Sequence, residues 1–354
     1  MKRVLSSLVL GLLAISTTTT ANAEPHKLEV QEVADTGSMP KGAFLSKDGS
    51  KFYVTNFGQL NKRNVTVYDS ATLEKVDQID VPGVVVEAAP SPDGKTLYVS
   101  NFRRSSVMFI DLATKAVKHE IKTGTHPKVL AVSPDGKNLY AANWATNDVT
   151  QIDTHSATVV RTMKAGLQPR GMVATKSGKL YVANFNGKSI DVFEGPEMEK
   201  SKRIDVCKCP RHLALSPDEK TLYISCLNAN QVHAMDLGTD EVKHKVTIGN
   251  APKSIAVSKD GRWVWSADFG ESRSISVVDT HDWTSRVLKV PGMDRGSGVA
   301  VAPDGKHALV TGWFDNHVYL VGFEGSGGHP EETKTKIRRW QNQPFKDESN
   351  PGAS

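Results

Sequence analysis

The sequence lacks the short motifs that usually announce an enzyme. It contains no GxSxG, no HExxH, no GxxxxGK[ST] and no GxGxxG placed between a strand and a helix. The usual sequence basis for a serine hydrolase, a zinc peptidase or a nucleotide-binding enzyme is therefore missing. Only three cysteines are present and none lies in a CxxCH motif, which excludes covalently attached c-type haem.

Long apolar runs are also scarce, and charge is nearly balanced. The one extended run, Val4–Ile15, follows Lys2-Arg3 and precedes Ala21-Asn22-Ala23. This order predicts a signal peptide over residues 1–23, a mature chain from Glu24 and a periplasmic or secreted protein without an integral membrane segment. With 44 Lys+Arg against 39 Asp+Glu, the formal charge of +5 does not favour nucleic acid as a partner.

A repeated phrase dominates what is present. It occurs seven times, from SKDGSKFYVTNF through SPDGKTLYVSNF to APDGKHALVTGW, at spacings of 41 to 45 residues. A period in the low forties with four short apolar runs per copy is typical of a propeller blade rather than of a helical solenoid. The residues aligned at the end of the phrase are Asn56, Asn101, Asn143, Asn184, Cys226, Asp268 and Gly312.

The third copy shows why each repeat should form four strands. Residues 128–133 and 139–143 are apolar runs that flank the turn sequence PDGK, and residues 148–153 and 158–163 follow as two further runs. Strands that are apolar on both faces must be covered on both sides, so each blade needs two neighbours. We therefore expect an all-β, seven-bladed β-propeller with four-stranded antiparallel blades.

The strand count predicts how the ring closes. The seventh copy ends after three strands near residues 317–323, whereas residues 28–34 have no blade of their own. We expect residues 28–34 to be the outer strand of the last blade, within a propeller domain over residues 24–324. The polar stretch 325–354 is expected to be a disordered tail, or else a short partner-binding segment anchored by Trp340 and Phe345.

The segments Tyr53–Asn56, Tyr98–Asn101 and Tyr181–Asn184 resemble the repeat of YVTN-family propeller proteins, and the resemblance covers about residues 28–323. It implies the seven-bladed fold. Similar propellers occur as exported or surface-layer proteins, as heavy subunits of quinoprotein amine dehydrogenases and as lactonase-like enzymes. The resemblance therefore does not choose among these functions.

A cation follows the start of the first strand in five of the seven copies. If that strand lines the centre of the ring, the five side chains surround the channel mouth and could bind an anionic ligand or an acidic protein partner. The alternative is that they are part of the repeat and point into solvent. The predicted ligand-binding residues are Lys41, Lys128, Arg170, Arg211 and Lys253.

The three cysteines fall in the fifth copy. Antiparallel register places Cys209 close to Cys226, which predicts a disulfide between them in an oxidising compartment, although Cys207 could replace either partner. Free thiols are a second possibility. A soft-metal site from Cys207, Cys209, Cys226 and His212 is the third.

We expect a monomeric binding or interaction module rather than an enzyme, without a bound cofactor. The alternative is a propeller enzyme or enzyme subunit, either a lactonase-like hydrolase or a quinoprotein dehydrogenase-type heavy subunit. An enzyme should present at least two acids or histidines within hydrogen-bond reach at the channel mouth.

Overall fold

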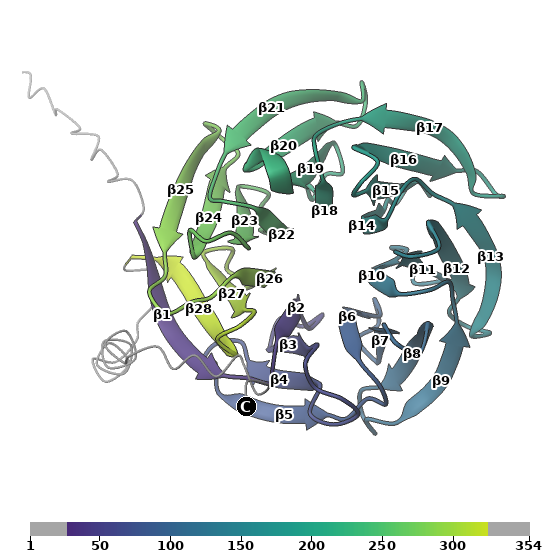
Figure 1. Cartoon of the computed structure of the whole chain (residues 1–354), viewed down its shortest axis with the longest axis horizontal. Helices are drawn as coiled ribbons and strands as arrows, with labels where there is room; N and C mark the ends of the chain where they lie inside the picture. The colour runs from purple at the N-terminus through teal and green to yellow at the C-terminus, as the bar shows by residue number, and fades with distance from the viewer. Residues whose placement is uncertain (1–26, 325–354) are drawn as a thin grey trace, which may run out of the picture.

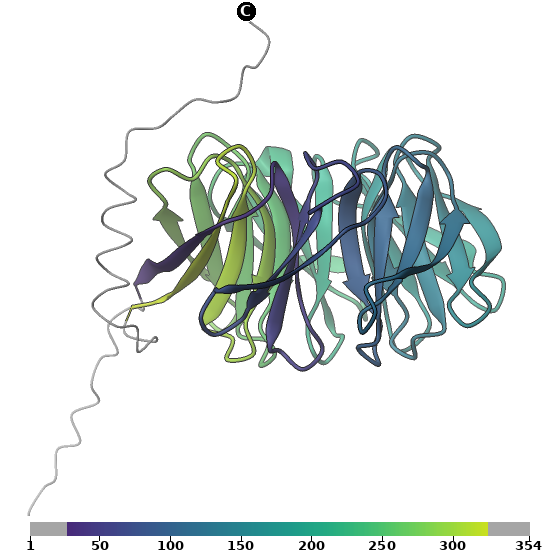
Figure 2. The same ribbon diagram turned by 90° about the horizontal axis from the view of Figure 1, so that it is seen from below.

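The computed structural model describes residues 27–324, and the predicted signal peptide and tail lie outside these residues. The described chain forms seven four-stranded antiparallel sheets that follow one another around a ring (Figure 1). Seen from the edge, the ring is a disc whose inner strands run through its thickness (Figure 2). The predicted seven-bladed propeller is confirmed.

Each blade begins with a strand nearest the centre of the ring. These inner strands are β2 Pro40–Leu45, β6 Val85–Pro90, β10 Pro127–Val132, β14 Pro169–Ala174, β18 Pro210–Leu215, β22 Pro252–Val257 and β26 Gly296–Val301. The second strands carry the repeated phrase. They are β3 Lys51–Asn56, β7 Thr96–Asn101, β11 Asn138–Asn143, β15 Leu180–Asn184, β19 Thr221–Cys226, β23 Trp263–Asp268 and β27 His307–Gly312.

The third and fourth strands complete each blade toward the rim. The third strands are β4 Val65–Asp69, β8 Ser106–Asp111, β12 Asp148–Asp153, β16 Ser189–Glu194, β20 Gln231–Asp236, β24 Ser274–Asp279 and β28 His317–Phe323. The outer strands are β5 Lys75–Ile79, β9 Val117–Lys122, β13 Thr158–Lys164, β17 Glu199–Asp205, β21 Glu241–Thr247, β25 Thr284–Lys289 and β1 Leu28–Asp35. A 3₁₀ turn, η1 Leu227–Ala229, follows β19 in blade five.

The Ser-Pro-Asp-Gly sequences form the turns between the first two strands. In blade two, Ser91 donates a hydrogen bond to Asp93, and Asp93 accepts the backbone N–H of Lys95 at 3.0 Å. Gly94 has a φ of +75°, a left-handed conformation that glycine adopts at little cost. These carboxylates are turn formers, as the sequence predicted.

Neighbouring blades share apolar clusters, which explains why the ring must close. Val65 and Val67 of blade one pack with Val85, Leu97 and Ile110 of blade two, and all five are buried. Complete burial of one such side chain contributes about 1.5–3 kcal/mol. No single blade covers both of its apolar faces, so the stability of each blade depends on its neighbours.

Hydroxyl groups in the repeated phrase also join adjacent blades. Thr55 donates to the backbone carbonyl of Val86 at 2.9 Å, and Ser100 donates to that of Lys128 at 2.7 Å. Both acceptors belong to the inner strand of the next blade. In blades one and two, the hydroxyl residue before the repeated asparagine therefore ties the blade to the inner strand of the next one.

The ring closes in blade seven as predicted. Strand β1 pairs antiparallel with β28, from Leu28 opposite Phe323 to Asp35 opposite His317, so the last blade combines both ends of the described chain. Leu28 is buried in the cluster that contains Trp263. Closure thus provides the outer strand that the seventh repeat lacks.

Candidate functional site

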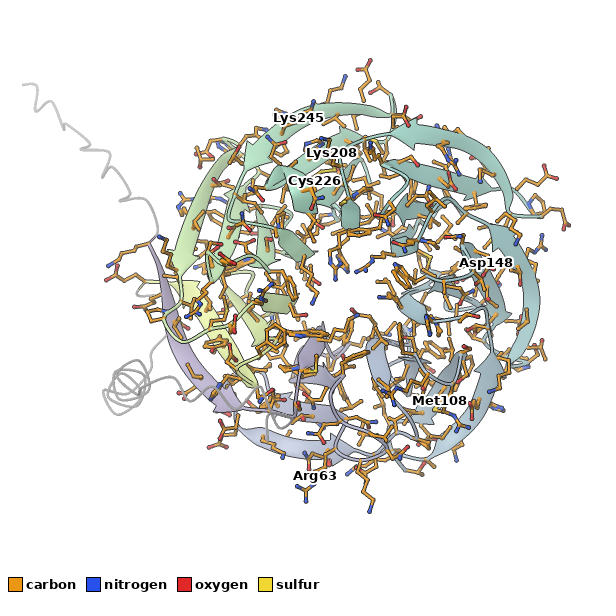
Figure 3. All side chains as sticks on the ribbon, in the orientation of Figure 1. Arg63, Met108, Asp148, Lys208, Cys226 and Lys245 are labelled. Carbon is orange, nitrogen blue, oxygen red and sulfur yellow. A yellow bond between two sulfur atoms is a disulfide. The ribbon has the colours of Figure 1, made fainter. Side chains whose placement is uncertain are left out.

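The five predicted cations lie together at the centre of the ring. Each is the second residue of an inner strand, next to a shift in the register with the second strand, and Figure 3 shows inner-strand side chains directed toward the centre. Only 8% of Lys41 and 4% of Lys253 is exposed. Lys128, Arg170 and Arg211 are half-buried. None of the five side chains is fully exposed.

One carboxylate, that of Glu87, lies among these cations. Lys41 Nζ is 3.3 Å from Glu87 Oε1, and the same carboxylate interacts electrostatically with Arg170 and Arg211. In blade two, Val86 and Glu87 stand where five other blades carry a cation. In the structure Glu87 is the countercharge of the group. We call Lys41, Glu87, Lys128, Arg170, Arg211 and Lys253 the central cluster.

Aromatic rings alternate with the cations of the central cluster. Lys128 Nζ lies 4.5 Å from the ring centre of Trp144, and Lys253 Nζ lies 4.2 Å from the ring centres of Phe269 and Trp313. Cations over aromatic faces are attracted by the ring quadrupole. Further pairs are Lys128–Phe102, Arg170–Trp144, Arg170–Phe185 and Arg211–Phe185. The aromatic residue of the repeat thus contacts the cations as well as neighbouring blades.

Burial and mutual repulsion lower the pKa values of the central lysines. Burial lowers the pKa of Lys41 to about 8, although Glu87 opposes this shift. Burial, together with Arg170 and other cations, lowers the pKa of Lys128 to about 6. The pKa of Lys253 falls for the same reasons. Five basic groups around one acid therefore make a region where a further negative charge would be stabilised.

Besides the lysines, two groups at the centre could take part in proton transfer. Glu87 is one, and His212 is the other. The backbone N–H of Ile255 donates to His212 Nδ1 at 3.5 Å, and burial lowers the pKa of this histidine. Glu87 and His212 interact electrostatically, while the close partner of Glu87 is Lys41. The centre is consequently richer in cations than in acid–base pairs.

The disulfide joins Cys207 to Cys226, so the predicted pairing of Cys209 with Cys226 is wrong. The Cα atoms of Cys207 and Cys226 are 5.8 Å apart, within the range that a disulfide requires. Cys209 has a φ of +56°, which takes its side chain out of the strand alternation that the prediction assumed. Its thiol is free and accepts a hydrogen bond from Asn228 at 3.2 Å.

The structure does not bring together the four residues of the predicted metal site, Cys207, Cys209, Cys226 and His212. His212 belongs to the surroundings of the central cluster, and Cys209 lies near Arg170 and Arg211. Instead, a ring nitrogen of His233 lies within 4.8 Å of the sulfur atoms of Cys207 and Cys226. Sequence reasoning missed His233, although β19–β20 register could have placed it on the same face as Cys226.

These observations define the class of the protein: a seven-bladed β-propeller with a partly buried cationic centre. A model of the YNCE-like beta-propeller family matches residues 85–324. The chain therefore belongs to the YNCE-like β-propeller family, which is consistent with the YVTN-type resemblance of the repeats. Within residues 27–324, no helix has the length and apolar character needed to cross a membrane.

Two known proteins illustrate the similarity. Antigen Lp49 of Leptospira interrogans serogroup Icterohaemorrhagiae serovar copenhageni is 34% identical over 105 residues, which is 26% of this chain and 23% of the antigen. The match thus spans less than a quarter of the antigen's length. A chain of Kuenenia stuttgartiensis hydrazine synthase superimposes with a TM-score of 0.71 at 21% identity, covering 86% of this chain and 99% of that one. This second likeness concerns the fold alone.

Proposed function

We propose that this protein is an exported binding module whose central cluster binds an anionic ligand. The ligand is a small anion or an acidic segment of a protein partner, since both offer the same carboxylate or oxyanion chemistry. The observation that carries the proposal is the gathering of five basic side chains, two buried and three half-buried, around the carboxylate of Glu87. Export rests on the predicted signal peptide, residues 1–23.

Charge and desolvation support anion binding. Buried cations are stable only when a partner compensates the loss of hydration. Glu87 is a close ion-pair partner of Lys41 and interacts electrostatically with the other cations. The close partners of those cations include aromatic rings and polar groups, such as Ser297 beside Lys253. A bound anion would supply further countercharge and raise the lysine pKa values toward their ordinary range.

The direct test is a titration with sulfate, whose charge stays constant above pH 4, and with a polyglutamate peptide as the protein-like probe. Arg170→Glu together with Arg211→Glu should weaken binding at least about tenfold. Lys208→Glu together with Lys245→Glu is the matched control, because it makes the same charge change at exposed positions labelled in Figure 3. Equal losses in both double variants would contradict the proposal.

The pH dependence gives a second measurement with the same probe. Protonated lysine attracts an anion and neutral lysine does not, and the pKa values of Lys128 and Lys41 in the free protein are about 6 and about 8. Sulfate affinity should therefore fall as pH rises from 6 to 9, and binding should be coupled to proton uptake. Calorimetry in two buffers of different ionisation enthalpy measures that uptake. Binding without proton uptake would count against the central cluster.

An enzyme is the second candidate function, and Lys128 is the observation that favours it. With a pKa of about 6, its amine is neutral at pH 7 and could act as a base or nucleophile. A lactonase-like hydrolase or a quinoprotein dehydrogenase-type subunit would use the same centre. Turnover of a lactone or an amine that Lys128→Met abolishes would favour this reading, whereas sulfate binding without any turnover favours the binding module.

A further inference from the structure

Blade five contains a buried group of three potential soft-metal ligands apart from the central cluster. Cys207 lies between β17 and β18, Cys226 ends β19 and His233 is the third residue of β20. Their exposed fractions are 7%, 0% and 5%. The two sulfur atoms and one imidazole nitrogen all lie within 4.8 Å of one another. Three elements therefore converge on one small volume; Figure 3 labels Cys226 within it.

Strand register explains why His233 faces the sulfurs. Cys226 is paired with Gln231, and Ile224 with His233. Paired residues, and residues two positions apart on a strand, point to the same face of a sheet. Gln231 and His233 therefore share the face that carries Cys226. His233 Nε2 is 2.9 Å from Gln231 Oε1. Its Nδ1 is buried without a hydrogen-bond partner. An unpaired buried ring nitrogen is costly and calls for an explanation.

We propose that Cys207, Cys226 and His233 form a redox-gated site for one Cu(I) ion. With the disulfide intact the sulfurs are not available as thiolates. A dithiol reductant transfers two electrons and two protons to the disulfide, becomes a disulfide itself and leaves the thiols of Cys207 and Cys226. Cu(I) then displaces the two thiol protons, which pass to solvent, and His233 donates a neutral nitrogen.

The number and kind of donors favour copper over zinc. Thiolate and imidazole are soft or intermediate ligands, and soft ligands select Cu(I). Structural zinc sites are almost always four-coordinate, whereas this group offers three donors. The proposal does not depend on anion binding, since none of the three residues belongs to the central cluster. Cys209 and His212 are also excluded, because they contact Asn228 and Ile255 instead.

The experiment uses the mature chain carrying Cys209→Ser, which leaves only the two thiols of the proposed site. The protein is reduced with dithiothreitol, desalted without oxygen and titrated with Cu(I) in competition with bicinchoninate. We expect one equivalent to bind with a thiolate-to-copper absorption in the ultraviolet. The oxidised protein should bind none. His233→Gln and His233→Leu should each weaken binding at least about tenfold, whereas His212→Gln should not.

Three results would overturn the proposal: no binding after reduction, equal binding by the oxidised protein, or unchanged affinity in both His233 variants. Circular dichroism accompanies each titration because reduction removes a cross-link. If the reduced chain unfolds, Cu(I) must restore the native spectrum, and it must do so less well in the His233 variants. Failure of this recovery also refutes the site, whereas anion binding would be untouched by any of these outcomes.

Discussion

A single substitution within the repeat changes the electrostatics of blade six. Blades one to four place an asparagine at the end of the second strand, and blade six places Asp268 there. Its carboxylate is fully buried and accepts hydrogen bonds from Ser266, Ser274 and Ser276 at 2.6–2.9 Å. Burial raises the pKa of Asp268 to about 7, although the three serines oppose the shift. At alkaline pH the protein therefore holds a desolvated negative charge.

Asp268→Asn should stabilise the protein at pH 8. The folded-state pKa of about 7 exceeds the ordinary value of 3.8, so Asp268 contributes stability at low pH that is lost as pH rises through 7. The amide carries no charge and should raise the free energy of unfolding at pH 8 by about 1–3 kcal/mol. Urea denaturation at pH 5 and pH 8 measures the difference.

Asn143→Asp is the matched control for that substitution. Asn143 donates to Asp148 at 2.7 Å, so a carboxylate at this position would face another one. This variant should lose stability at pH 8. An equal response of the two variants to pH would show that the buried carboxylate of Asp268 does not cause the effect.

At the scale of elements, β1 holds the ring closed. It supplies the fourth strand of a blade whose other three strands come from the opposite end of the described chain. Its loss would expose the edge of β28 and the apolar cluster that includes Leu28 and Trp263. Propeller closure is thus a contact between distant parts of the chain rather than a property of one repeat.

A chain that begins at Thr36 should be severely destabilised. It lacks all eight residues of β1, so we expect its melting temperature to fall by at least about 10 °C, or expression only as aggregates. A chain that begins at Lys27 keeps the strand and serves as the control. Thermal melting of the two purified proteins is the measurement. Coincident melting curves would mean that β1 does not hold the blade.

The disulfide between Cys207 and Cys226 closes a loop of chain within blade five. Cys207 and Cys226 are 19 residues apart, and the loop contains β18 and most of β19. Replacing both cysteines with alanine should lower the free energy of unfolding by about 3 kcal/mol, because the unfolded chain regains freedom. Cys209→Ser should change it little. Peptide mapping of the non-reduced protein checks the pairing, and a Cys209–Cys226 peptide would contradict it.

At the scale of the whole molecule, ring closure creates the central cluster. Blades one to six each contribute one of its six charges, and no pair of neighbouring blades would bring all of them together. The shared consequence is repulsion among Lys41, Lys128 and the other cations, which adds to burial in lowering the lysine pKa values. Because these pKa values are lowered only in the folded ring, the free energy of unfolding should depend on pH.

Stability should rise with pH in the alkaline range. The unfolded lysines titrate near 10.5, whereas Lys41 and Lys128 titrate at about 8 and about 6 in the folded protein. Between pH 7.5 and 9.5 the unfolded chain consequently binds more protons, and raising the pH favours folding. Lys128→Met should make this dependence shallower by about 0.5–1 kcal/mol per pH unit. Lys208→Met should leave it unchanged, and denaturation across this pH range compares the variants.

The sequence by itself determined the seven blades, the strand order within each blade and the closing role of residues 28–34. Turn residues and alternating apolar residues act over short distances, so seven copies of one pattern specify seven copies of one unit. It also placed the cations at the starts of inner strands, because each position could be predicted from the repeat.

Only the tertiary structure decided which side chains meet. The repeat pattern gave Glu87 no role, yet its carboxylate pairs with Lys41 once blades one and two pack together. Cys209 lost its predicted partner because its left-handed backbone breaks the strand alternation, and Cys207 faces Cys226 instead. The repeat pattern predicts local conformation. Burial, the interactions between charges and the disulfide pairing depend on the assembled ring.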